Sequence, residues 1–235
     1  MLKKILGFIL MRMTSLFLIK DLFYSRMGSL GINDLQAIHN KFVNTKEKST
    51  IAIDIGCGTI PQNKFNAKKI IGLDLQENKK QGVIKIRVGF EKLPFKDSSI
   101  DYITAYDLLE HIPRYADLPE QNNNPFIFLM NECYRVLKKN GVFLSMTPVY
   151  PFSHAFCDPT HNNIMTKDTL RLYFSNQKFK VASHYGIKTN FKVSYEKMFE
   201  PHLICILKKN KKYKDFISLL FIRIMTVYFR QPFYI

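Results

Sequence analysis

The stretch TIAIDIGCGTIP, residues 50–61, joins a short apolar run to a glycine-rich turn. Residues 50–54 are predicted to form a buried strand, because small and β-branched apolar side chains dominate the run. Gly56 and Gly58 follow at once, and glycine allows a tight turn while a ligand approaches the main chain without meeting a Cβ. The stretch therefore predicts an α/β sheet with a ligand at the carboxyl end of its first strand.

Apolar runs alternate with helical patterns from about residue 50 to residue 208, which is typical of a parallel α/β sheet. We predict a Rossmann-like, doubly wound sheet of seven strands, mostly parallel with an antiparallel C-terminal strand, and helical N- and C-terminal flanks. A terminal hairpin should close one sheet edge. The strands are expected at residues 50–54, 69–74, 82–87, 100–105, 141–146, about 180–187 and 202–207. Helices are expected between the first two strands, from Pro125 with Asn124 as its cap, and from Thr166.

Asp74 ends the second predicted strand, 20 residues after Asp54, where a carboxylate can reach both hydroxyls of a ribose. The full GxGxxG pattern of dinucleotide enzymes is absent. Pro61 and its neighbours also reduce the number of backbone donors available to a pyrophosphate. Asp54 can face an ammonium group. A cofactor that carries an amino acid and a ribose but no pyrophosphate therefore fits better than NAD.

The glycine-rich segment at residues 54–61 resembles motif I of the class I S-adenosylmethionine-dependent methyltransferases. The resemblance extends over about residues 49–208, because EKLPFKDSSIDY at 91–102, LEHI at 109–112 and RVLKKNG at 135–141 are similar to later motifs in the same order. The domain most resembles type 11-like methyltransferase domains, similar to those of bacterial surface-glycan pathways. This resemblance implies S-adenosyl-L-methionine as the cofactor.

The resemblance also implies which residues contact that cofactor. Gly56 and Gly58 would line its methionine and ribose part, Asp54 would face the amino group, and Asp74 would hold the ribose hydroxyls. Gly89 stands where the family often has an acid for the adenine, so Phe90 would offer a backbone contact or a stacking face instead. The full predicted set is Asp54, Gly56, Gly58, Asp74, Leu75, Phe90, Glu91 and Asp107.

Four residues are candidates for catalysis at the methyl acceptor, namely His111, His154, Asp158 and His161. They follow the fourth and fifth predicted strands, whose carboxyl ends should face the ligand. Neutral histidine suits proton removal from a hydroxyl near pH 7, so His154 or His161, oriented by Asp158, is expected to act as the base. No metal is predicted. Three alternatives remain: a divalent ion held by His154, Asp158 and His161; a simple Asp-capped turn at Asp158; and a structural His111.

Composition bounds the other properties. The 235 residues are 46% hydrophobic, which excludes a disordered or fibrous chain. The four cysteines form no CxxC pair, so neither a zinc cluster nor a disulfide framework is expected, and a reducing cytoplasm fits best. Residues 1–19 lack a cleavage site and are expected to be retained. We predict three segments: a helical N-terminal flank at 1–48, a methyltransferase domain at 49–208, and a basic, apolar C-terminal helix at 209–235.

The net charge of +16 favours an anionic partner. Lysines at 208–214 precede an apolar, aromatic run at 216–229, a combination typical of a segment in a membrane interface. We expect a cytoplasmic enzyme, peripheral on the inner membrane face, that O-methylates a sugar of a surface glycan or lipid-linked precursor. The alternatives are a small-molecule or lipid acceptor, a catalytically silent scaffold, or flanks that pack on the core. Nucleic acid is not favoured as a partner, because no RNA-binding module is recognisable. The sequence predicts no particular oligomeric state.

Overall fold

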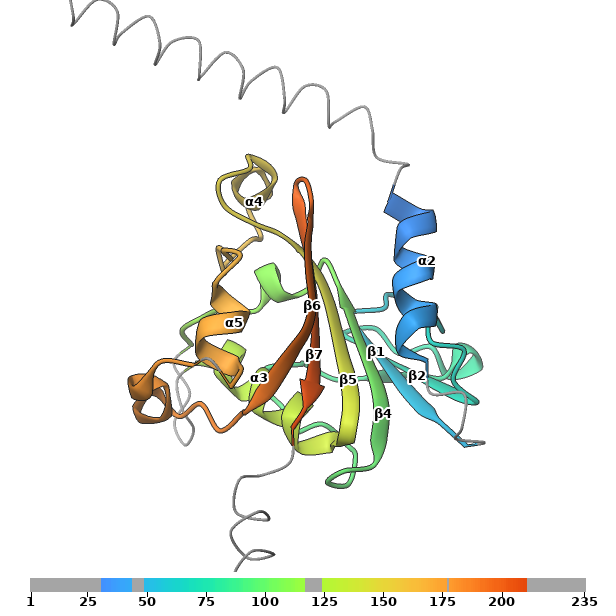
Figure 1. Ribbon diagram of the computed structural model, residues 1–235. Coiled ribbons are helices and arrows are strands. Elements are labelled where there is room, and N and C mark those ends of the chain that lie inside the picture. Colours follow the sequence, from blue (N-terminus) through green and yellow to red (C-terminus); the bar gives the residue numbers. More distant parts are fainter. Residues whose placement is uncertain (1–30, 44–48, 117–123, 177, 211–235) are drawn as a thin grey trace, which may run out of the picture.

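One seven-stranded sheet organises the molecule. The computed structural model describes residues 31–43, 49–116, 124–176 and 178–210 (Figure 1). The strand order is β3-β2-β1-β4-β5-β7-β6. The strands are β1 (Ile51–Ile55), β2 (Lys69–Asp74), β3 (Val83–Lys85), β4 (Ile100–Tyr106), β5 (Leu137–Pro148), β6 (Phe191–Phe199) and β7 (His202–Lys209).

The strand directions confirm the predicted mixed sheet. β1 to β5 pair in parallel, whereas β7 pairs antiparallel with both β5 and β6. The hairpin of β6 and β7 closes one edge, as predicted. The central strands are buried along most of their length, as β4 shows with six consecutive buried residues. Their continuous apolar sequence follows from this two-sided burial.

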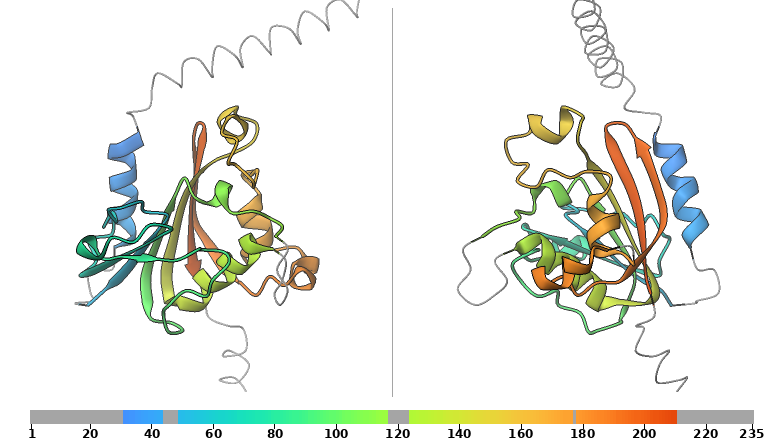
Figure 2. Two further views of the ribbon diagram at one scale, coloured as in Figure 1. Left: turned by 180° about the vertical axis from the view of Figure 1, so that it is seen from behind. Right: turned by 60° about the vertical axis from the view of Figure 1, so that its left-hand side comes forward.

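Helices cover the two faces of the sheet unequally. The helices are α2 (Gly31–Phe42), α3 (Pro125–Val136), α4 (His154–Cys157) and α5 (Thr169–Phe174), with short 3-10 turns η1 (Lys79–Gln81), η2 (Leu109–His111) and η3 (Lys180–Tyr185). Figures 1 and 2 show α3 and α5 on one side of the sheet and α2 on the other. The predicted cap of α3 is confirmed, because Oδ1 of Asn124 accepts a hydrogen bond from the Ile127 amide at 2.9 Å.

The helix expected between the first two strands does not form, and this prediction is wrong. Residues 56–68 make turns instead, and the amide and carbonyl of Ala67 both bond the Asn63 side chain. Phe65 fills the place of the helix by stacking on Tyr102, with ring centroids 4.5 Å apart. Ile38 of α2 joins the same apolar cluster, so a helix that precedes β1 covers this face.

Two element positions near the C-terminus also differ from the prediction. Residues 180–187 form no strand, because Val181 and Tyr185 are exposed and the segment closes as η3 with Gly186 at φ 81°. The sixth strand is β6 instead, whose first residue, Phe191, is fully buried. The helix expected from Thr166 begins three residues later, at Thr169.

The flanks are described only in part. α2 belongs to the predicted helical N-terminal flank, whereas residues 1–30 and 211–235 lie outside the described residues. The apolar run at 216–229 that is expected in a membrane interface lies there, whereas Lys208 and Lys209 belong to β7. Within the described part of the chain, the helices are too short or too polar to span a bilayer. The domain boundaries at 48/49 and 208/209 stay predictions.

Candidate functional site

The strand order creates a crevice between β1 and β4. After β1 the chain moves outward to β2 and β3, and then returns to the other side of β1 as β4. Ligands of open α/β sheets bind at such a switch point, beyond the carboxyl ends of the strands. The loops after β1 and β4 approach each other closely here, because a Cβ on Gly56 would lie 2.8 Å from Cδ1 of Leu108. The glycine turn therefore lines the crevice.

Both glycines of the turn have left-handed backbones, with φ +72° at Gly56 and φ +62° at Gly58. Residues other than glycine rarely adopt this backbone conformation. A Cβ on Gly58 would have no other heavy atom within 4 Å, so the backbone there borders open space. This open, glycine-built surface suits a ligand that lies against the main chain.

Gly56→Ala is expected to destabilise the fold more than Gly58→Ala. Both substitutions put a Cβ on a left-handed backbone, which costs about 1–2 kcal/mol. Only the Cβ at Gly56 also collides with Leu108, and such overpacking adds about 1–3 kcal/mol. Urea unfolding of the two variants measures the difference. Equal losses of unfolding free energy would contradict the packing at Leu108.

Asp54 is buried, with 2% of its surface exposed. Its Oδ1 accepts a hydrogen bond from the Thr104 hydroxyl at 2.6 Å, and its Oδ2 accepts one from the Gln62 amide at 2.8 Å. Burial raises the pKa of the Asp54 carboxyl, and these two hydrogen bonds oppose the rise. Asp54 thus fastens the segment after the glycine turn to β4. Its predicted contact with the cofactor's amino group stays a prediction.

Asp74 stands at the end of β2 and links that strand to the glycine turn. Its Oδ2 accepts a hydrogen bond from the Gly58 amide at 2.8 Å, and its Oδ1 accepts one from the Gln76 amide at 3.2 Å. Each carboxylate oxygen can accept a further hydrogen bond. Two adjacent ribose hydroxyls can therefore donate to Asp74 without displacing the protein's own contacts. Leu75, which is 64% exposed, offers apolar surface beside it.

The predicted adenine side is held by Arg87. Its guanidinium carbon lies 3.8 Å from the centroid of the Phe90 ring, and its amide donates to Oε1 of Glu91 at 2.7 Å. One face of the Phe90 ring is thus covered by a cation, and the predicted stacking of Phe90 on the adenine stays a prediction. Gly89 has φ +86°, and a Cβ there would lie 3.0 Å from Ile112. The turn at Gly89 therefore passes so close to Ile112, directly after η2, that a side chain at position 89 would not fit.

Asp107 follows β4 with φ +45°. Its Oδ1 lies 3.1 Å from Nε2 of His202, at the start of β7. The residue is exposed at the carboxyl edge of the sheet, on the far side of the crevice from the glycine turn. Its predicted role in cofactor binding stays a prediction.

The structure brings together His111 and His161, which are far apart in the sequence. Their ring centroids lie 4.8 Å apart. Nε2 of His161 lies 3.9 Å from Oδ2 of Asp158, and Nδ1 of His111 lies 3.0 Å from the Thr160 hydroxyl. His154 lies outside this group of contacts, at the start of α4, where its Nδ1 is buried without a hydrogen-bond partner.

Asp158 does form the capped turn that was one alternative. Its Oδ1 accepts hydrogen bonds from the amide and the hydroxyl of Thr160, at 2.7 and 2.6 Å. These bonds lower the pKa of the Asp158 carboxyl. The turn and the contact with His161 use different oxygens of the carboxylate, so the two interpretations of Asp158 are compatible.

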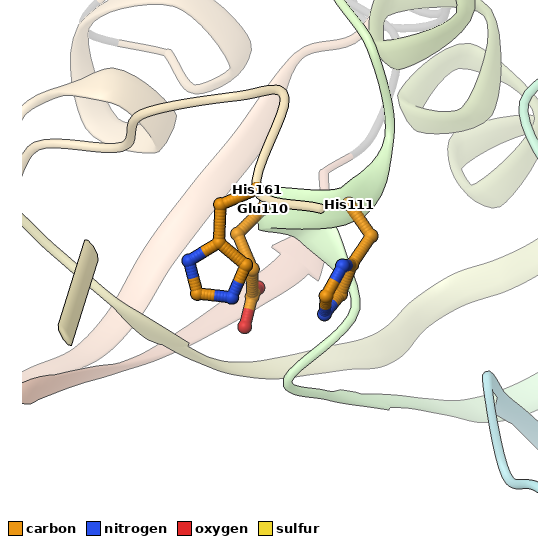
Figure 3. Close-up of side chains that lie close together, drawn as sticks. All are labelled: Glu110, His111 and His161. Carbon is orange, nitrogen blue, oxygen red and sulfur yellow. The ribbon is translucent and has the colours of Figure 1, made fainter. Parts of the chain in front are cut away.

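Glu110 is the group that the predicted site omitted. Its carboxylate lies between His111 and His161 (Figure 3), and the residue is 1% exposed. Oε2 accepts a hydrogen bond from the Thr147 hydroxyl at 2.6 Å, whereas Oε1 is buried without a partner. Burial raises the pKa of this carboxyl. The Glu-His pair inside LEHI was visible in the sequence, but the burial of Glu110 was not.

Asn163 fixes the loop of His161 against η2. Its amide donates to the Glu110 carbonyl at 2.9 Å, and its Nδ2 donates to the Leu109 carbonyl at 3.0 Å. Its Oδ1 accepts a hydrogen bond from Nε of Arg114. Three hydrogen bonds from one fully buried side chain and its backbone preorganise the cluster.

A cavity of about 630 Å³ opens next to this loop. Its walls are mainly aromatic and aliphatic, with polar groups from the chain after η2 and from the turn before α5. The lining residues are Arg114, Tyr115, Asn124, Phe126, Ile127, Ile164, Thr166, Thr169, Tyr173, Phe174, Tyr185 and Ile187. Arg114 lines this cavity and donates to Asn163, which holds the loop of His161, so one hydrogen bond connects the cavity wall with that loop.

The sheet order defines a Rossmann-like α/β domain, and the glycine turn and Asp74 are suited to a nucleoside-containing ligand. Residues 53–145 match the family model of a methyltransferase domain. Over these residues the chain is similar to S-adenosylmethionine-dependent methyltransferases, and this similarity implies S-adenosyl-L-methionine as the cofactor.

Individual proteins agree with this assignment. Over 132 residues the chain is 33% identical to a protein named as a probable S-adenosylmethionine-dependent methyltransferase from Mycolicibacterium smegmatis. The match covers 52% of this chain and 47% of that protein, so the chain spans about half the length of this relative. The activity of that whole protein is therefore not assigned to this chain.

One of two similar solved structures supports the fold. One chain from the complex of the Haloferax volcanii Trm112 methyltransferase activator with a methyltransferase superposes with a TM-score of 0.51 at 12% identity, covering 78% of this chain and 93% of that chain. An Archaeoglobus fulgidus SAM-dependent methyltransferase gives a TM-score of 0.47 at 16% identity, covering 75% and 94%.

The observed residues fit the cofactor. Gly58 leaves open space for it, and Asp74 keeps acceptor capacity on both oxygens, as a ribose requires. Once bound, the cofactor supplies a methyl group on a sulfonium sulfur. The chain's own part would be to bind and orient that molecule and its acceptor, and to exclude water.

Proposed function

We propose that the protein transfers a methyl group from S-adenosylmethionine to a hydroxyl oxygen of a sugar, in a surface glycan or its lipid-linked precursor. The observation that carries the oxygen acceptor is the contact of His111 and His161 beside Asp158, at the same sheet edge as the glycine turn. A sulfonium is already a good leaving group. The protein must therefore add alignment and a means of removing the hydroxyl proton.

His161 is the best-supported proton acceptor among the candidates. Its Nδ1 faces the Ala155 carbonyl at 3.3 Å, which favours the tautomer with a proton on Nδ1 and a lone pair on Nε2. Asp158, 3.9 Å from that Nε2, would stabilise the imidazolium that proton removal creates. This arrangement supports general-base chemistry on a hydroxyl.

The cavity beside the cluster favours a second candidate, an acceptor that is a lipid or an apolar small molecule. Its walls carry more apolar than polar side chains. Such walls hold the apolar part of a ligand and leave a few polar groups to orient it. A lipid-linked sugar would satisfy both observations.

The basic charge supports a peripheral location on the inner face of the cytoplasmic membrane. With a net charge of +16, the protein is attracted to anionic lipid surfaces. A lipid-linked acceptor would be met at that surface. Nucleic acid stays the less favoured partner, and a catalytically silent scaffold is the alternative from another class.

His161→Ala is expected to lower the rate of S-adenosylhomocysteine formation by about 100-fold or more, because general-base catalysis contributes about 10²–10⁴-fold. The assay uses lipid and glycan extracts as acceptors and mass spectrometry to find the methylated product. His184→Ala, on the exposed turn η3, is the matched control and should keep the full rate.

Two results would contradict the proposal. An unchanged rate in His161→Ala would remove the residue from the chemistry. Binding of S-adenosylhomocysteine without turnover in any extract would favour the scaffold. A methylated lipid that carries no sugar would select the second candidate acceptor.

A further inference from the structure

Three potential metal ligands converge at the carboxyl edge of the sheet. Glu110, His111 and His161 each offer one ligand atom, and these atoms all lie within 4.8 Å of one another (Figure 3). We propose that the three residues bind one divalent metal ion. The set differs from the alternative considered on sequence, because Glu110 and His111 take the places of His154 and Asp158.

The strongest indication is the buried oxygen of Glu110. Oε1 has no hydrogen-bond partner, although the residue is 1% exposed and Oε2 is held by Thr147. A buried carboxylate oxygen without a partner is costly, since it has lost its water and gained nothing in return. A cation between the Glu110 carboxylate and the two imidazoles would remove that cost.

Both histidines are held in the orientation that metal ligands adopt. Nδ1 of His161 faces the Ala155 carbonyl at 3.3 Å, and Nδ1 of His111 faces the Thr160 carbonyl at 3.3 Å and the hydroxyl of the same residue at 3.0 Å. Metal-bound histidines commonly donate one ring N–H to an oxygen and use the other nitrogen for the ion. Nε2 of each ring is then available as the ligand.

The neighbourhood supplies further negative charge. Oδ2 of Asp158 lies 3.9 Å from Nε2 of His161, and a lone pair so close to a carboxylate is unfavourable unless a positive charge lies near both. Arg114 is engaged by Asn163 and the Ile164 carbonyl, on the cavity side of the loop. A bound ion would compensate the Glu110 carboxylate, and Asp158 would add negative charge beside the ligand His161.

The ligand atoms are close enough for an ion to draw them in. Metal–ligand bonds of about 2.0–2.2 Å place neighbouring ligand atoms about 3–3.5 Å apart. The present limit of 4.8 Å therefore requires a closure of about 1–2 Å, which side-chain rotation can supply. Two imidazoles and one carboxylate favour zinc, manganese, iron or cobalt over magnesium or calcium.

The role of this ion rests on the proposed function. Three protein ligands leave coordination positions open, where an acceptor hydroxyl can bind. A bound ion lowers the pKa of that hydroxyl, so its proton passes to water or to Asp158. The oxygen lone pair then forms the C–O bond, while the S–CH₃ electrons stay on sulfur as a neutral thioether. In this scheme the ion replaces His161 as the means of removing the hydroxyl proton. His111 and His161 act as ligands, and the loss of rate expected in His161→Ala then reflects loss of the ion.

The test measures metal binding directly on the full-length chain without a histidine tag. The protein is stripped with a chelator, dialysed and titrated with Co²⁺, and the visible absorption of the protein-bound ion is followed. Competition with Zn²⁺ gives the affinity. We expect one ion per chain, and at least a 10-fold loss of affinity in each of Glu110→Gln, His111→Ala and His161→Ala.

Two controls separate ligand loss from unfolding. His184→Ala should bind Co²⁺ as the unmodified chain does. S-adenosylhomocysteine affinity and the melting temperature should change little in His111→Ala, whose side chain is partly exposed. Absence of one tight site in the unmodified chain, or unchanged affinity in all three ligand variants, would overturn the proposal.

Turnover then separates this inference from the proposed function. If Co²⁺ binds and the three variants lose it, but no extract is methylated, the metal site stands and the proposed function fails. If methylation proceeds at the full rate in the chelator-stripped enzyme, the function stands and the metal's role is overturned.

Discussion

Asp74→Ala is expected to weaken S-adenosylhomocysteine binding by about 100-fold or more. Two hydrogen bonds from ribose hydroxyls to a carboxylate contribute about 1.5–3 kcal/mol each, and 1.4 kcal/mol corresponds to a tenfold change. The substitution also frees the Gly58 amide, which Asp74 holds at 2.8 Å, so the glycine turn loses one of its supports. Isothermal titration calorimetry on the full-length chain measures the affinity.

Two further variants make this measurement specific. Asp74→Asn keeps an acceptor for the Gly58 amide but loses the charge, so its affinity should fall between those of the unmodified chain and Asp74→Ala. Glu77→Ala, in the exposed segment that follows β2, should bind normally. Equal affinities in all four proteins would exclude Asp74 as the ribose ligand.

Arg135→Ala is expected to reduce the free energy of unfolding by about 3–5 kcal/mol, the cost of leaving a buried charge unpaired. The Arg135 guanidinium donates to both carboxylate oxygens of Glu132, at 2.7 and 2.6 Å, and to the carbonyls of Leu93 and Phe95. Glu132 is only 7% exposed. Removal of the guanidinium would leave the negative charge of Glu132 buried without its ion-pair partner. Urea unfolding measures this reduction in the free energy of unfolding.

Asp97 supplies the matched control for this network. It also pairs with Arg135, at 2.8 Å, but its side chain is 76% exposed, so Asp97→Ala should leave the unfolding midpoint unchanged. In a Glu132→Gln background, which removes the buried negative charge, Arg135→Ala should reduce the free energy of unfolding by clearly less. If Arg135→Ala is as mild as Asp97→Ala, the buried pair does not stabilise the fold.

The motifs that could be predicted are the ones encoded locally. The turn at Gly56 and Gly58 and the acid at Asp74 lie within one strand–loop–strand unit, so their spacing alone indicates a ribose site. The start of α3 was also readable, because a cap at Asn124 depends on only the next three residues. Residues this close together meet in almost any version of the fold.

The wrong predictions have a common cause. The helix expected after Gly58 and the strand expected at 180–187 depend on which segment covers or extends the sheet. Phe65 and α2 cover the face where a helix was expected, and β6 takes the edge position instead of residues 180–187. Local propensity does not encode such competition between distant segments.

The sequence by itself determined the fold class of the domain and indicated its cofactor and the carboxylate expected to hold the ribose, because those signals are short and ordered along the chain. Only the tertiary structure joined Glu110 and His111 to His161, 50 residues further on, and left an oxygen of Glu110 buried without a partner. Burial and convergence are properties of the packed sheet edge, where loops that follow different strands meet. The proposed metal site could therefore emerge only from the fold.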